Sequence, residues 1–204
     1  MVFLRIIRSP LKSKTAMSIA LLIGAFLAAP ISSSHADVLF NQEFKFFKVR
    51  GENSQQIFRD FQKRSPIKAK GKFDATLGVA AIKLTPEVEY EIKGKRCHVQ
   101  DARVTADVVI HLPDWVNYQE ADNIGKLSWD KLFSDIKAHE LQHAAIAKDY
   151  ANRIQKRIKR SFSRGNCDKL EAVLKKTSSR LLAKHDRAQR RFDEKEYGRL
   201  FKRK

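Results

Sequence analysis

Cysteine is scarce in this sequence, with only Cys97 and Cys167 among 204 residues and no C-x-x-C pair. The missing spacing argues against cysteines that bind a metal or remain as free thiols. The export signal predicted for residues 1–36 implies an oxidising compartment, so we expect one disulfide between the two cysteines. That bond would close a loop of about 70 residues and contribute roughly 4 kcal/mol to stability in the chain-entropy model.

The sequence also lacks an apolar run long enough to cross a membrane. Its apolar run at residues 17–29 has 13 residues, whereas a membrane-spanning helix needs about 20. Four basic residues and no acidic residue precede the run, and Ser34-His35-Ala36 follows it with Asp37 next. These are the parts of a secretory signal peptide rather than of an uncleaved anchor. We therefore expect cleavage after Ala36, a periplasmic or secreted protein, and no transmembrane helix in the mature chain.

Acidic residues are few: Asp and Glu total 23 against 41 Lys and Arg, which gives a formal net charge of +18. The mature chain keeps most of this charge, which indicates affinity for an anionic envelope surface such as lipid headgroups or an acidic polymer. Nucleic acid is not an expected partner of an exported protein. The sequence shows no internal repeat or low-complexity segment, so residues 37–204, about 170 residues, suit a single domain.

The segment His139-Glu140-Leu141-Gln142-His143 fits the motif H-E-x-x-H. Residues four apart lie on one face of a helix, so both imidazoles can reach a single zinc ion. Glu140 follows the first histidine, where its carboxylate can accept a proton from a water on the metal as that water attacks a carbonyl. The pattern favours zinc hydrolase chemistry over two hydrogen-bonded core histidines or a chance match.

The residues around the motif predict one long amphipathic helix. It should begin with Ser128 as the N-cap and end near Phe162. Its apolar positions recur at steps of three, four or eight, and His139 and His143 fall on the same inward stripe.

Segments before this helix alternate between apolar and polar residues and predict strands. We expect strands at residues 43–50, 77–84, 86–93 and 99–112, and a short helix at residues 54–63. Period-two patterning with short connections favours antiparallel pairing. The strand at 99–112 is the candidate edge that would hold an extended peptide substrate. The expected fold is α+β, a small antiparallel sheet followed by a long antiparallel helix pair that carries the motif.

A second helix should begin near Cys167, because Gly165 and Asn166 suit the end of one helix and the N-cap of the next. Catalytic zinc usually takes three protein ligands, and the sequence lacks a histidine six residues after the pair. Folding the chain about Gly165 places His143 level with roughly residue 187 and His139 level with roughly residue 191. Four residues near that level are candidates that spacing does not separate: His185, Asp186, Asp193 and Glu196.

The chain resembles the predicted secreted zinc-dependent proteases of bacteria, a group first catalogued as a domain of unknown function. The resemblance covers nearly the whole mature chain, and the H-E-x-x-H is its specific part. Its looser parts are two cysteines, several aromatic positions and a late F-D-x-x-E: Cys97, Leu112-Pro113, Trp115, Trp129, Phe133, Cys167 and Phe192-Asp193-Glu194-Lys195-Glu196. The resemblance implies a zincin-like fold, zinc binding by His139 and His143, and general-base catalysis by Glu140.

The resemblance also favours Asp193 or Glu196 over His185 as the third ligand, and we choose Asp193. The predicted protein is a metallopeptidase with one zinc ion that hydrolyses a peptide or protein substrate. One alternative is a catalytically inactive envelope protein that zinc stabilises. Another is a basic module that binds anionic envelope surfaces while the histidines are incidental.

Overall fold

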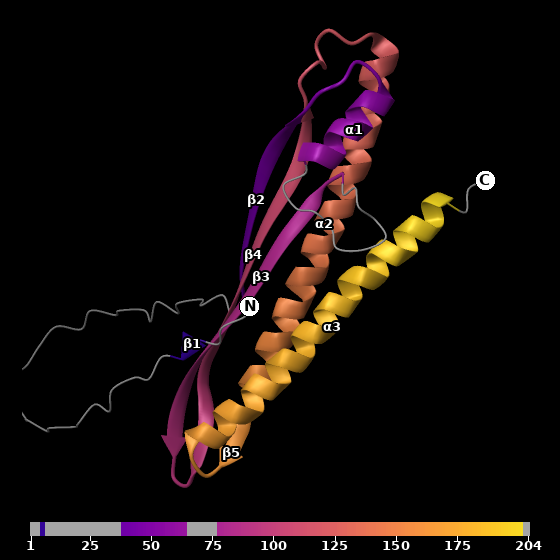
Figure 1. Cartoon of the computed structure of the whole chain (residues 1–204). Helices are drawn as coiled ribbons and strands as arrows, with labels where there is room; N and C mark the ends of the chain where they lie inside the picture. Colours follow the sequence, from indigo (N-terminus) through magenta and orange to yellow (C-terminus); the bar gives the residue numbers. More distant parts are fainter. Residues whose placement is uncertain (1–4, 7–37, 65–76, 202–204) are drawn as a thin grey trace, which may run out of the picture.

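The computed structural model describes residues 5–6, 38–64 and 77–201, which form a mixed α+β fold with a small sheet and three helices (Figure 1). The predicted signal peptide lies outside the described residues, apart from the strand at Arg5 and Ile6. The elements in chain order are β1 (Arg5–Ile6), β2 (Val38–Val49), α1 (Ser54–Arg64), β3 (Val79–Lys93), β4 (Arg96–Trp115), α2 (Asn123–Lys159), β5 (Phe162–Arg164) and α3 (Cys167–Phe201).

The sheet has the order β1-β3-β4-β2, with β5 paired to one end of β4. β3 pairs antiparallel with β4, from Val79 opposite His111 to Lys93 opposite Arg96. β2 pairs with β4 in parallel, so the expected purely antiparallel sheet is wrong. α1 and β3 lie between β2 and β4 in the sequence, and this long connection allows the parallel return. β4 is therefore an interior strand, and the prediction that residues 99–112 form a substrate-binding edge is also wrong.

β3 is one continuous strand where the sequence predicted two, at 77–84 and 86–93. Pro86 suggested the break, but it lies within β3 opposite Val104. A proline is tolerated in an edge strand, because the N–H that it lacks is not needed there for a second ladder. Within the described residues, β1 joins the outer side of β3 only at Glu87 and Val88.

The core lies between the sheet and α2, which runs along one face of it (Figure 1). The predicted alternation of the strand at 99–112 is confirmed, because its apolar set is buried on one side. The buried positions are Val104, Ala106, Val108, Ile110 and Leu112 on β4, and Ile136, Ala144, Ala147, Ala151, Ile154 and Ile158 on α2. Three of the six α2 residues are alanines, which lets the helix backbone approach the sheet closely.

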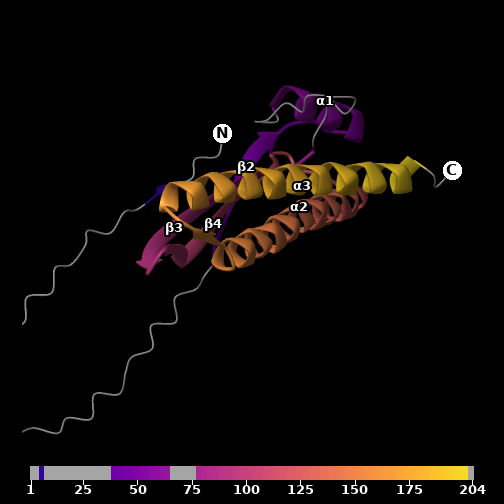
Figure 2. The ribbon, with the colours of Figure 1, turned by 90° about the horizontal axis from the view of Figure 1, so that it is seen from below.

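The long helix begins earlier than the sequence predicted. Asp122, rather than Ser128, is the N-cap of α2, and its carboxylate accepts the N–H of Gly125 at 2.6 Å. At the other end the expected break is present: Gly165 has φ +132°, and Asn166 accepts the N–H of Lys169 at 3.2 Å as the N-cap of α3. α2 and α3 then lie side by side as an antiparallel pair (Figure 2).

The predicted disulfide is present between Cys97 of β4 and Cys167, the first residue of α3, with the Cα atoms 5.2 Å apart. β5, which the sequence did not predict, pairs with β4 beside this bond, with Ser163 opposite Cys97. The start of α3 is thus fastened to the sheet. Among the described residues, no helix has the length and apolar character needed to cross a membrane.

Candidate metal centre

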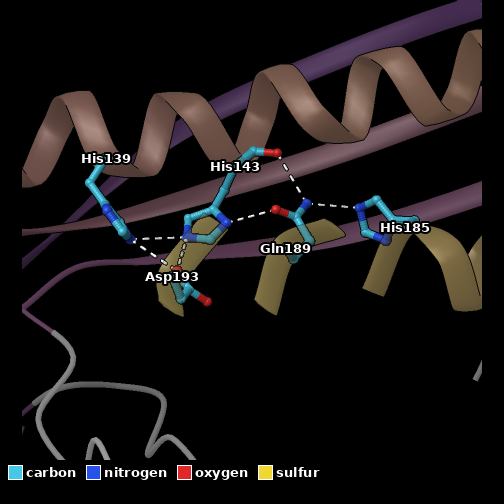
Figure 3. Close-up of polar contacts among 5 residues, drawn as sticks. All are labelled: His139, His143, His185, Gln189 and Asp193. Atoms are coloured by element: carbon cyan, nitrogen blue, oxygen red, sulfur yellow. Dashed lines mark hydrogen bonds and ion pairs between the residues drawn. The ribbon is translucent and has the colours of Figure 1, made fainter. Parts of the chain in front are cut away.

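The two histidines of the motif lie on the flank of α2 that faces α3, and their side chains point toward one another (Figure 3). The Nε2 atoms of His139 and His143 are 3.1 Å apart. The face of α2 buried against the sheet carries Glu140 instead, because Glu140 is four residues from both Ile136 and Ala144 in that buried row. The side chains of the motif therefore point in two directions from α2: the imidazoles point toward α3, and the carboxylate points toward β3.

Asp193 of α3 reaches the same point from the neighbouring helix (Figure 3). Its Oδ1 lies 3.2 Å from Nε2 of His139 and 2.9 Å from Nε2 of His143. Among the described residues, these three are the group of potential ligands whose donor atoms lie close enough together to hold an ion. The structure thus brings together the three residues that the sequence analysis named as ligands.

The triangle of donor atoms has nearly the size that zinc requires. Zinc binds nitrogen and oxygen at about 2.0–2.1 Å in tetrahedral sites, which places two ligand atoms roughly 3.3 Å apart. The observed sides of 2.9, 3.1 and 3.2 Å need to open only slightly. Three protein donors with a fourth direction left for water or substrate also match the donor set of a catalytic zinc site. The residues present therefore fit a zinc ion.

Gln189 of α3 sets the orientation of His143, and the sequence analysis missed it. The Nε2 of Gln189 donates to the backbone carbonyl of His143 at 3.1 Å, which fixes the amide so that its Oε1 faces the imidazole. That Oε1 accepts from Nδ1 of His143 at 2.7 Å. In the neutral ring Nδ1 therefore carries the proton, and Nε2 keeps the lone pair that can bind a metal. The residues His185, Gln189 and Asp193 recur at every fourth position, a spacing that places them on one face of α3.

His185, a rival for the third ligand, lies outside the donor triangle. Its Nε2 faces Nε2 of Gln189 at 2.8 Å (Figure 3). Its Nδ1 lies 3.1 Å from Oδ1 of Asp186. Both nitrogens of the buried ring are therefore occupied, and Asp186 turns toward His185 rather than toward the motif. Glu196 is likewise not part of the triangle formed within the described residues.

Glu140 is held tightly between α2 and β3, with only 5 % of its surface exposed. Its carboxylate accepts the backbone N–H of Ala80. Gly78 makes room for it, because a Cβ at that position would lie 2.7 Å from Cγ2 of Ile136 and 3.0 Å from Cγ of Glu140. Burial raises the pKa of Glu140 above its ordinary value, although His143 and His139 partly oppose the shift. A raised pKa is typical of a carboxyl group that exchanges protons near neutral pH.

The charges of the triangle stabilise one another. Burial acts to raise the pKa of Asp193, but hydrogen bonds with His139 and His143 outweigh it and hold the pKa below its ordinary value. Burial also acts to lower the pKa of His143, and its hydrogen bonds with Asp193 and Gln189 outweigh it and raise the pKa. Without metal, this site therefore favours an ionised Asp193 and shifts His143 toward its protonated form, and a cation entering the triangle would compete with that proton.

Phe192 packs against both imidazoles, with ring centroids 4.7 Å from His139 and 5.0 Å from His143. This residue belongs to the late F-D-x-x-E pattern that the sequence analysis noted, although no role was assigned to it. Its ring thus forms one apolar side of the donor triangle.

Comparison with known proteins places the chain in a family but gives it no activity. No curated protein and no solved structure matches it. A family model described as "Bacterial protein of unknown function (DUF922)" matches residues 44–199, which include the whole donor triangle and both cysteines. That description names neither zinc nor proteolysis. The chain belongs to this family of bacterial proteins, DUF922.

Proposed function

We propose that the protein is a secreted or periplasmic zinc-dependent metallopeptidase. The observation that carries this proposal is the convergence of two Nε2 atoms and one carboxylate oxygen within 3.2 Å of one another, beside a buried glutamate. His139, His143 and Asp193 would hold the ion. When bound, zinc would supply a Lewis acid that polarises a peptide carbonyl and acidifies a water.

Glu140 is the proposed general base. Its raised pKa suits a carboxylate that takes a proton from water and returns it to the leaving amine. The Ala80 N–H and the wall at Gly78 hold this side chain against β3, so that its position relative to the histidines is fixed. Gln189 holds the ring of His143 in the orientation that directs Nε2 toward the site.

The outer edge of β3, rather than β4, is the proposed binding site for an extended peptide. Residues 79–86 have no strand on their outer side within the described part of the chain. β1 covers only Glu87 and Val88, and it belongs to the leader that we expect to be removed. A peptide could add to this edge by backbone hydrogen bonds close to Glu140.

A second candidate function has one observation in its favour. Glu140 is almost fully buried and already bonded to Ala80, which also suits a residue that only joins α2 to β3. On this alternative, the protein binds zinc for stability and catalyses nothing.

Two measurements separate these functions in the exported chain. Metal analysis should find one zinc per protein, and the ion should be lost in His139→Ala and His143→Ala. Peptidase activity against unfolded protein substrates should fall by about 10²–10⁴-fold in Glu140→Gln, while the exposed control Glu120→Gln keeps full activity. Protein without zinc contradicts both candidates. Zinc in wild type and in Glu140→Gln, with no activity in either, supports the inactive alternative.

A further inference from the structure

A concave site lies between α2 and α3, away from the donor triangle. This groove has a volume of about 670 Å³, within the range of sites that hold small molecules or chain segments. It begins on α2 at Arg153, ten residues beyond His143, which corresponds to roughly 15 Å along the helix. The groove and the metal centre are therefore separate places on the same helix pair.

The groove is lined almost entirely by basic side chains. Those from α2 are Arg153, Lys156 and Arg157, followed by its C-cap Arg160, and those from α3 are Arg180, Lys184 and Arg187. All seven are exposed. No acidic residue lines the groove, and among the described residues Arg153 alone of the seven has an assigned ion pair, with Asp149 at 2.8 Å. Seven like charges around one hollow repel one another, and a bound anion would relieve that repulsion.

The basic residues form two rows that face each other across the groove. On α3 they recur at steps of four and three, and on α2 Arg153 is followed by the adjacent pair Lys156 and Arg157 and then by Arg160, so that each row lies along one side of its helix. Thr177, Leu181 and Ala183 complete the lining with short or aliphatic side chains. Two rows of basic residues along a groove fit a narrow, flexible polymer better than the flat surface of a bilayer.

The types of residue that line the groove indicate the chemistry of the polymer that it would bind. Five of the seven cations are arginines, whose planar guanidinium groups bind the paired oxygens of a phosphate through two hydrogen bonds. No aromatic side chain lines the groove, so it offers no stacking surface for nucleic-acid bases. We propose that this groove between α2 and α3 binds a linear, non-nucleic-acid polymer with a phosphodiester in each repeat. The proposal does not depend on the metal centre.

Binding of a labelled oligo(glycerol phosphate) of about six units to the full exported chain tests the proposal, with fluorescence anisotropy as the measurement. We expect saturable binding to one site. The double variant Arg157→Gln/Arg180→Gln removes one charge from each row of basic residues. It should weaken binding by roughly 100-fold, or tenfold for each guanidinium. The matched control Arg59→Gln/Lys175→Gln removes the same charge from exposed positions outside the groove and should change binding less than twofold.

Three further arms make the result decisive. Treatment of the wild-type chain with a metal chelator should leave binding of the oligomer unchanged, since the groove does not use the metal centre. Phosphatidylglycerol vesicles and a polyuronate of equal charge should bind more weakly than the oligomer. Equal losses in the groove and control variants would overturn the proposal in favour of diffuse charge attraction. Preferential binding of vesicles or polyuronate would also overturn it, as would no binding of the oligomer. If Arg157→Gln/Arg180→Gln has a lower melting temperature, Lys156→Gln/Lys184→Gln replaces it with the same expectation.

Discussion

Replacement of Asp193 by asparagine tests the assignment of the third ligand most directly. Asparagine keeps the size of the side chain but removes the negative charge that pairs with both imidazoles at 2.9 and 3.2 Å. Structural zinc sites with four ligands bind with about 10–16 kcal/mol, or roughly 2.5–4 kcal/mol for each ligand. The Asp193 side chain is 47 % exposed, so water already stabilises its charge before metal binds. We therefore expect the lower end of that range, a loss of zinc affinity of at least about 100-fold.

Competition with a chromophoric zinc chelator measures this affinity, and the matched control lies on the same helix. Asp186→Asn makes the same chemical change seven residues earlier, at a carboxylate that contacts His185 and not the donor triangle. Zinc affinity in this control should stay within about threefold of wild type, since its effect reaches the metal only through Gln189. Glu196→Gln should behave like the control. If either variant loses more affinity than Asp193→Asn, the geometric reasoning that places Asp193 in the triangle is refuted.

Three further predictions concern the surroundings of the site. Gln189→Leu should lower zinc affinity by about 10–100-fold in chelator competition, because His143 loses the partner that orients it; the buried control Gln155→Leu should keep wild-type affinity. Cys97→Ala/Cys167→Ala should lower the free energy of unfolding in urea by about 4 kcal/mol, from a closed loop with a sequence separation of 70 residues, and an unchanged urea midpoint would contradict this. Burial raises the pKa of Tyr90 to about 12, so its folded state favours the neutral hydroxyl, and this contribution to stability is complete below pH 10 and lost as pH rises toward 12. Tyr90→Phe should therefore flatten the alkaline decline of the melting temperature, and equal declines in both proteins would contradict the prediction.

The parts of this structure that the sequence predicted are those that depend on local spacing. The histidines lie four residues apart and therefore share one face of α2, and the alternation of residues 99–112 correctly separates the buried face of β4. The antiparallel return of α3 followed from Gly165 and Asn166, which bracket a short break. Two cysteines without a C-x-x-C left one pairing to consider, and the structure contains it.

The remaining features depend on interactions that no single segment encodes. A period of two does not tell whether a neighbouring strand runs parallel, so the β2–β4 pairing was not predicted. Ser128 and Asp122 are both good caps by residue type, and the sequence pattern does not choose between them. Equal helical rise about Gly165 placed the motif level with residues 187 to 191, yet Asp193 meets it; residues 160–166 between the two helices are not helical, so equal rise on both sides does not hold there. The contact between Glu140 and β3 depends on Gly78, which the sequence showed only as part of an apolar segment.

The disulfide at the start of α3 and the carboxylate near its end have a joint mechanical consequence. From Cys167 to Asp193 the helix rises about 39 Å, so a small change in its angle at the disulfide becomes a larger displacement near Asp193. A tilt of only about two degrees moves Asp193 by roughly 1.4 Å, which is enough to pull the carboxylate out of the triangle. Reduction of the disulfide should therefore weaken the binding of the proposed zinc ion before the domain unfolds.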